Sequence, residues 1–147
     1  MSTGILGTRA TWVADVNLIL QVAMLLVLLF AALQAKRRNL GLHRTLMIAL
    51  VVTNAVAIIA IMNPSFFRSL PYALSHAGAR GPRVLWPHVA IGTVAELMGI
   101  YSVIVTKGGT SIQLARERHL GRVMRITVLL WIVSLLLGVM SYCVRYM

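Results

Sequence analysis

The sequence predicts an all-α fold, a single bundle of four transmembrane helices, from its composition, its apolar blocks and its charge pattern. Of the 147 residues, 59% are hydrophobic and 12% are charged, whereas about a quarter of a soluble domain is charged. The apolar residues form four blocks, and a block of about 20 residues spans the roughly 30 Å hydrocarbon layer. The basic residues lie between the blocks, as membrane-flanking charges do. A chain of this length fits one domain, residues 1–147.

Charged or helix-breaking residues bound the four predicted spans, which are residues 16–35, 45–62, 88–106 and 126–144. The first span lies between Asp15 and Lys36, and no basic region with a short apolar core precedes it, so we expect a retained helix. The second ends at Asn63 and Pro64, because proline lacks an N–H group and fixes φ. The outer loop 64–87 holds four prolines and is predicted to form short pieces along the membrane surface, as a docking surface or a lid.

The basic residues favour one orientation of the bundle. The connections after the first and third spans carry nine Lys or Arg residues, counting Arg125, and the opposite side carries five. Because positive residues in short loops stay in the cytoplasm, both termini are predicted to face outward from a cell inner (plasma) membrane. Seven aromatic residues fall near the predicted outer interface, where amphipathic rings prefer to lie: Trp12, Phe66, Phe67, Tyr72, Trp86, Tyr142 and Tyr146.

Several functional classes lack support. Fourteen basic residues against three acidic ones do not form a stripe, and short loops offer little surface for nucleic acid. The expected partners are the lipid bilayer and other membrane protein subunits. Cys143 is the single cysteine, which excludes an internal disulfide or a thiolate cluster. The sequence holds no phosphate loop, nucleophile elbow, zincin motif or CxxC, so we do not expect an enzyme.

Polar and small residues recur at helical spacing on each span and predict the faces that look into the bundle. These residues are Asn17, Gln21 and Met24 on the first span, His43, Met47, Leu50, Asn54 and Ala57 along the second, His88, Gly92, Ala95 and Gly99 on the third, and Thr127, Ser134, Gly138 and Ser141 on the fourth, with Trp131 at its flank. Small and hydroxyl residues are common packing devices in membrane helices, so most of this pattern predicts close helix packing.

Glu96 is the acid predicted to lie inside the membrane. It follows His88 by eight residues, or about 12 Å along a helix, which places it near the middle of the bilayer. A bare carboxylate is unfavourable there, so we expect it to be protonated, paired or bonded to a polar neighbour such as Asn54 or Gln21. Proton relay or ligand contact is one interpretation, and a structural hydrogen-bonded carboxyl is the other.

The four histidines divide by depth into two pairs, His43 and His119 at the inner side and His76 and His88 at the outer side. Imidazole is a common ligand of metals and of haem iron, and facing helices of a bundle hold such cofactors. The inner haem hypothesis adds Met47 as a possible axial thioether. It also adds Arg44, Arg122 and Arg125 as partners of propionates.

A copper site built from His76 and His88 is a weaker alternative. The simpler interpretation is that each histidine lies at a membrane interface, where a polar aromatic side chain is tolerated.

Three segments resemble a family of small four-helix membrane proteins of unknown function, which includes an assembly factor for haem-A-containing terminal oxidases. They are LHRTLM at 42–47, the helix that begins at His88, and RHLGRVMRITVLLWIVSLLLGVMSY at 118–142. The resemblance covers residues 16–147 apart from the outer loop. It implies that His43, His88 and His119 contact a metal or haem.

One departure from the family concerns the outer site. The family usually ends its second helix with a histidine, where this chain has Ile61-Met62-Asn63-Pro64. Either His76 substitutes for that histidine through the loop or the outer site is lost, and the inner pair transfers cleanly.

Two functions follow as hypotheses. The first is a haem- or metal-binding protein of respiratory electron transfer or oxidase maturation. The second is an accessory subunit of a larger membrane complex that has no cofactor of its own.

Overall fold

The computed structural model describes residues 4–7, 9–107 and 113–147, and the side chains of these residues outside 106–120. Within those ranges the chain is helical and has no strand. Four helices are long and apolar enough to cross a membrane, namely Trp12–Lys36, Leu40–Ser75, Arg80–Val105 and Gly121–Tyr146. The predicted all-α four-helix fold is confirmed, and by the length and composition of these helices the chain is a multi-pass membrane protein.

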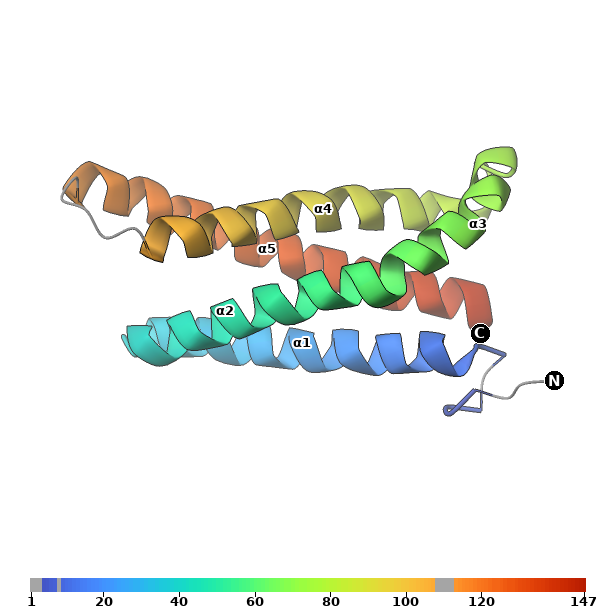
Figure 1. Ribbon diagram of the computed structural model, residues 1–147, viewed down its shortest axis with the longest axis horizontal. Helices are drawn as coiled ribbons and strands as arrows, with labels where there is room; N and C mark the ends of the chain where they lie inside the picture. The colour runs from blue at the N-terminus through green and yellow to red at the C-terminus, as the bar shows by residue number, and fades with distance from the viewer. Residues whose placement is uncertain (1–3, 8, 108–112) are drawn as a thin grey trace.

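The helices run up and down in an order that places both termini at one end (Figure 1). The elements are α1 (Trp12–Lys36), α2 (Leu40–Ala57), the π-helical turn η1 (Ile58–Met62), α3 (Asn63–Ser75), α4 (Arg80–Lys107) and α5 (Gln113–Tyr146). We call the end that holds both termini and the α3–α4 connection the termini end. The opposite end, which holds the α1–α2 connection, the end of α4 and the start of α5, is the basic end.

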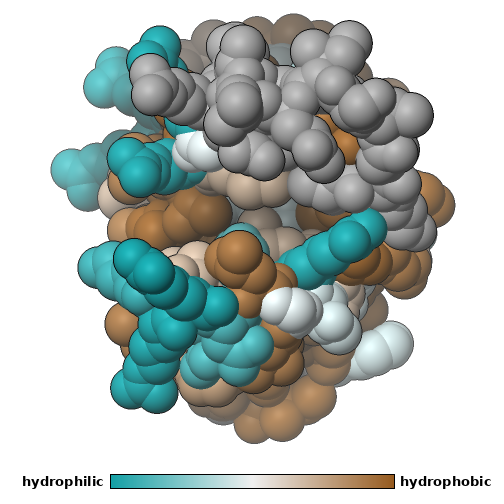
Figure 2. Space-filling model, turned by 90° about the vertical axis from the view of Figure 1, so that its left-hand side faces the viewer, coloured by the Kyte–Doolittle hydropathy of each residue, from teal (hydrophilic) through white to brown (hydrophobic). Residues whose placement is uncertain are grey.

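The connection from α1 to α2 is short and is fixed by local hydrogen bonds. Arg38 has a φ of 60°, in the left-handed region, which lets the chain reverse within Arg37–Asn39. The side chain of Asn39 then accepts a hydrogen bond from the Leu42 amide at 3.3 Å and caps α2. Figure 2 shows hydrophilic side chains gathered around this connection, above an apolar flank.

The second span is longer than predicted because the helix continues through Pro64. Proline cannot donate to the carbonyl four residues earlier, and its ring crowds that carbonyl. The chain accommodates this with η1, in which the amide of Asn63 donates to the carbonyl of Ile58, five residues back. The predicted stop at Asn63 and Pro64 is therefore replaced by a change of helical pitch.

Most of residues 64–87 are also helical, which corrects the predicted outer loop. Asn63–Ser75 form α3, and residues 80–87 are the first two turns of α4. Pro64 stands in the first turn of α3, where a missing N–H is tolerated. Pro71 and Pro87 lie inside their helices. The prolines are therefore accommodated within helices, and residues 76–79 form the connection between α3 and α4.

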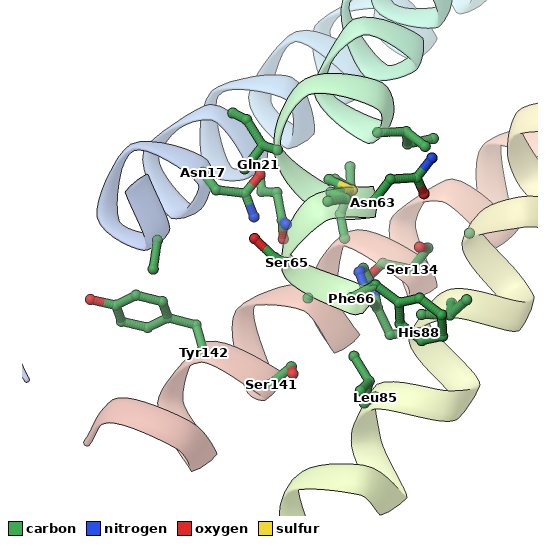
Figure 3. Close-up of a pocket in the computed structure, with 18 of the residues that line it drawn as sticks. Asn17, Gln21, Asn63, Ser65, Phe66, Leu85, His88, Ser134, Ser141 and Tyr142 are labelled. Carbon is green, nitrogen blue, oxygen red and sulfur yellow. The ribbon is translucent and has the colours of Figure 1, made fainter. Parts of the chain in front are cut away.

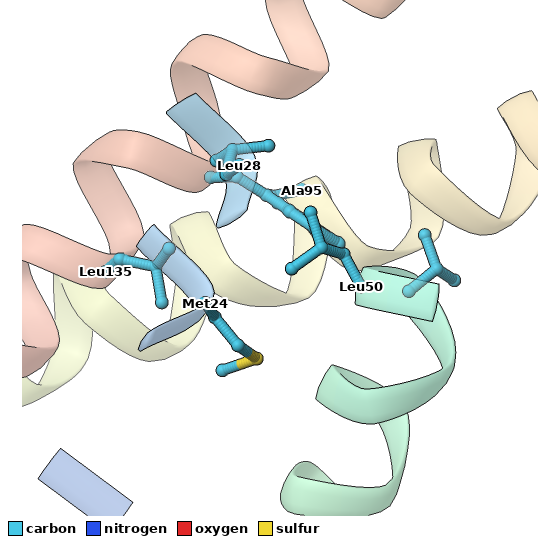
Figure 4. Packing of buried hydrophobic residues seen from close by; sticks show 7 residues of the cluster. Met24, Leu28, Leu50, Ala95 and Leu135 are labelled. Carbon is cyan, nitrogen blue, oxygen red and sulfur yellow. The ribbon is translucent and has the colours of Figure 1, made fainter. Parts of the chain in front are cut away.

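The apolar core lies where the four long helices converge (Figure 4). Its buried members are Met24, Leu28, Leu50, Val51, Ala95, Trp131 and Leu135. Gly99 lets α4 approach this core closely, because a Cβ atom there would lie 3.2 Å from Val51 and 3.4 Å from Trp131. Burial confirms the predicted inward faces at Gln21, Ala57 and Thr127 among others.

Asp15 ties the N-terminal segment and α5 to α1. It is fully buried, accepts a hydrogen bond from the Leu6 amide at 2.9 Å through Oδ2, and accepts another from the Tyr142 hydroxyl through Oδ1. A carboxylate with several donors is stable in a site without water. From the sequence, Asp15 is only the boundary of the first predicted span, whereas in the structure it links the N-terminal segment to the last helix.

We expect Asp15→Leu to release the N-terminal segment. The Leu6 amide and the Tyr142 hydroxyl would both lose their acceptor, at about 1–3 kcal/mol for each group left unpaired. Trypsin cleavage after the exposed Arg9 should therefore accelerate in detergent-solubilised protein. Tyr142→Phe, which keeps the Leu6 contact, is the matched comparison and should have a smaller effect. Equal cleavage rates in the wild type and Asp15→Leu would contradict this role.

Candidate functional site

A cavity of about 330 Å³ opens between the helices in the half of the bundle nearest the termini end. All five α-helices and η1 contribute side chains to its wall. Its polar lining residues include Asn17, Gln21, Asn54, Ser65, His88, Ser134 and Tyr142. In Figure 3, Asn17 and Gln21 of α1 lie across the space from His88 of α4 and Ser134 of α5. Small-molecule sites typically have volumes of about 300–1,000 Å³.

His88 presents a nitrogen lone pair to this cavity. Its Nδ1 lies 2.9 Å from the carbonyl oxygen of Ser134. A carbonyl oxygen only accepts hydrogen bonds, so Nδ1 carries the proton and Nε2 of the neutral ring carries the lone pair. Among the described residues nothing bonds to Nε2. His88 is therefore held in one tautomer by α5 and is available as an acceptor or a ligand.

Gly138 brings the amide of Gln21 next to His88. A Cβ atom built on Gly138 would lie 3.0 Å from Cε1 of His88 and would overlap Oε1 of Gln21. Glycine is thus needed here for the close approach of α1, α4 and α5. The Gln21 side chain is only 4% exposed, and it lines the cavity. Two acceptors, His88 Nε2 and Gln21 Oε1, consequently face the same small region.

Unpaired buried polar atoms concentrate around the cavity. In the described part of the chain four such side-chain atoms have no hydrogen-bond partner: Asn17 Oδ1, Gln21 Oε1, Glu96 Oε1 and Trp131 Nε1. The first two and Trp131 belong to residues that line the cavity. Buried polar groups are almost always paired, so a cluster of unpaired ones indicates a place for water or a ligand.

Glu96 lies one hydrogen bond behind the cavity wall. Its carboxyl is 6% exposed, and Oε2 accepts a hydrogen bond from Nδ2 of Asn54 at 2.7 Å. Of the two neighbours named from the sequence, Asn54 is the one to which Glu96 bonds. Asn54 itself lines the cavity. The pair connects α2 with α4 and sets a carboxyl close to a polar space inside the membrane.

The residues of the predicted inner haem site lie toward the basic end, away from this cavity. His43 Nδ1 donates to the carbonyl of Ala31 at 2.8 Å, which ties α2 to α1. Met47 packs against the apolar core. Arg44 and Arg122 are exposed. The side chain of His119 lies outside the described residues, so the pair of His43 and His119 stays a prediction.

His76 is not brought together with His88. It stands at the end of α3, where its ring stacks on Tyr72 with centroids 4.5 Å apart, and Nδ1 lies 2.8 Å from the Ser75 hydroxyl. It is exposed and is absent from the cavity lining. The described side chains also contain no group of three His, Cys, Asp or Glu residues close enough to hold a metal ion.

No family model, curated protein or solved structure matches the chain. The functional argument therefore depends on the residues and their geometry. The sequence predicted His88, Gln21, Asn54 and Glu96 as inward-facing polar groups, but it did not indicate a shared cavity. The contribution of α3 could not be found because residues 64–87 were expected to form a surface loop.

We expect Asn54→Leu to destabilise the bundle by about 1–3 kcal/mol, because it leaves both oxygens of the buried Glu96 carboxyl without a partner. Thermal unfolding in detergent measures this change. The double variant Asn54→Leu with Glu96→Leu removes both polar groups and should recover much of the loss. A double variant that is as unstable as the sum of Asn54→Leu and Glu96→Leu would show that the two side chains do not interact.

Proposed function

We propose that the protein binds a small, partly apolar ligand or cofactor within the membrane, and that His88 is its principal contact. The observation that carries this proposal is the cluster of unpaired buried polar atoms around the cavity. Such atoms are unfavourable in a bundle surrounded by hydrocarbon unless something occupies the space beside them. The wall also has apolar members, including Met24, Phe66 and Leu135, so the ligand combines polar and apolar surface.

The two acceptors next to Gly138 favour a ligand that donates a hydrogen bond or contains a metal ion. His88 Nε2 and Gln21 Oε1 both supply lone pairs, and Asn17 adds a third buried oxygen on the same helix as Gln21. A hydroxyl or amine group could donate to one of them, and a metal ion could bind the imidazole. A ligand with acceptors alone would leave these lone pairs unpaired and could use Trp131 Nε1, which is the donor among the unpaired atoms of the lining.

Haem or a metal ion is the cofactor that the family resemblance implies. His88 would supply one ligand, and Met24 and Met62, which also line the cavity, are candidates for a second through their thioether sulfurs. Such a cofactor would supply one-electron chemistry, while the chain would set its position and limit water around it. His43 and His119 form the alternative inner pair, and copper is the weaker alternative to haem.

We place this binding activity in respiratory electron transfer or oxidase maturation, in a cell inner membrane with both termini outward. The support is the resemblance of 42–47 and 118–142 to the family and the excess of basic residues at the basic end. In this orientation the cavity lies in the outer half of the bilayer. A terminal tag that is accessible from outside the cell would support the orientation.

We expect the purified protein to retain a ligand that His88→Ala loses. Native mass spectrometry and organic extraction detect any bound compound, and absorption spectra of the oxidised and reduced protein with metal analysis detect haem, copper or iron. His76→Ala is the matched control, because it removes an exposed histidine outside the cavity, and it should retain the ligand.

The outcomes separate the hypotheses. Loss of a haem spectrum in His43→Ala or His119→Ala, with no change in His88→Ala, would move the cofactor to the inner pair. A protein that carries no compound or metal by any of these measurements, even from native membranes, would contradict the binding proposal and favour the accessory subunit.

A further inference from the structure

The strongest remaining feature is a buried carboxyl that one side chain separates from a polar cavity. Glu96 is 6% exposed, Oε1 is buried without a partner, and Oε2 bonds to Asn54. Asn54 lines the cavity, whose wall continues past His88 to Ser141, Tyr142 and Arg145 near the termini end. Intramembrane carboxyls of this kind commonly mark proton pathways.

The cavity is large and polar enough to hold water along this path. One buried water needs roughly 10–15 Å³ and two to four polar partners, and the cavity has a volume of about 330 Å³. Its polar groups are spread along its length, from Tyr142 and Asn17 near the termini end to Gln21 and Asn54 further in. Ser65 and Arg145, the latter in the last turn of α5, are exposed lining residues, so the cavity opens at the surface of the bundle there.

Toward the basic end the carboxyl is sealed by apolar side chains. Leu50 lies one helical turn beyond Asn54 on α2 and is 3% exposed, and Leu28 of α1 is fully buried. Val51 lies close to Gly99 of α4. These residues belong to the apolar core. The buried hydroxyls of Ser102 and Thr127 also lie toward this end, but each donates to a carbonyl of its own helix, that of Met98 and that of Val123. The polar lining of the cavity therefore approaches Glu96 from the termini end.

The ionisable groups around this path are few in the described residues. Asp15 of α1, His88 of α4, and Tyr142, Arg145 and Tyr146 of α5 lie between Glu96 and the termini end, and His43 of α2 lies toward the basic end. Asn54 is the residue whose hydrogen bond to Glu96 the structure gives. Exchange at Glu96 thus depends on the Asn54 side chain and on water in the cavity.

We propose that the cavity is a proton half-channel through which Glu96 exchanges its proton with the aqueous phase at the termini end and not at the basic end. The O–H bond of the Glu96 carboxyl breaks as a new O–H bond forms on a water in the cavity, and the reverse step restores the acid. A ligand in the same cavity would displace that water, so binding and protonation of Glu96 would be coupled.

Infrared spectroscopy of the reconstituted protein tests this proposal. The carboxylic acid band that disappears in Glu96→Gln belongs to Glu96, and its shift on transfer to D₂O reports proton exchange. We expect the Glu96 proton to exchange rapidly in the wild type. When the cavity is filled, the Glu96 carboxylate must form without water beside it, and exchange should slow on the order of tenfold or more. The cavity is filled after folding by alkylating the introduced cysteine of Ser134→Cys with N-ethylmaleimide. Cys143→Ala removes the native cysteine, and the unmodified double variant is the control.

A second pair of variants covers the case in which Ser134→Cys does not fold or react. Ser141→Phe narrows the cavity near the termini end. Gly41→Phe introduces the same side chain at an exposed site near the basic end, where a Cβ atom would meet nothing within 4 Å. Ser141→Phe should slow exchange and Gly41→Phe should not.

The side of exchange is tested on proteoliposomes of known orientation, with a pH jump made on one side by an impermeant buffer. The Glu96 band should change only when the jump is made on the side of the termini end. Exchange that cavity filling leaves unchanged, a response from the basic end, or a wild-type band that never exchanges would each overturn the half-channel. These measurements use protein from which any copurified ligand has been extracted, because a ligand would displace the water, so their failure is distinct from failure of the binding proposal.

Discussion

A closed ring of four polar contacts between helices organises this bundle, because hydrocarbon supplies no hydrogen-bond partners to polar side chains. His43 ties α2 to the carbonyl of Ala31 in α1, and Asn54 ties α2 to Glu96 in α4. His88 ties α4 to Ser134 in α5, and Tyr142 ties α5 to Asp15 in α1. Each of these four helices is thus bonded to two others, at heights that span the bundle. The apolar core fills the space within this ring, and the cavity occupies the part of the bundle that side chains leave open.

The ring also explains why the unpaired atoms collect in one place. A side chain that serves a contact between helices has used one polar atom, and its second atom points elsewhere. For Glu96 and His88 the second atom is directed to the region of the cavity or just behind it. Oε1 of Gln21 and Oδ1 of Asn17 lie opposite on α1, and no donor among the described residues pairs with them. The cavity and the polar contacts are consequently two results of the same arrangement. A substitution that breaks one of these contacts will also change the shape of the cavity.

The sequence could predict the spans and their inward faces because both are local properties. Apolar length fixes a transmembrane helix, and the 100° step per residue fixes which side chains share a face, as at Gln21, Asn54 and Thr127. It could not predict which faces meet. The contact between Asp15 and Tyr142 joins residues 127 positions apart, and nothing in either neighbourhood indicates the other. The prolines gave a misleading signal, because the rule that they end helices assumes that the helix cannot change its pitch. In this chain the helix changes its pitch in η1 and continues through Pro64.

The π-helical turn has a consequence for how the cavity can vary between related chains. It contains one residue more than a plain α-helical turn, so the helix after it is rotated by about 100° relative to an uninterrupted one. Ser65, Phe66 and Ser69 follow this turn and form one wall of the cavity. Deletion of a single residue within Ile58–Met62 would therefore turn a different set of α3 side chains inward while the four spans stayed in place. Insertions and deletions, usually confined to loops, would here act as a way to exchange the wall of a binding site inside a membrane helix.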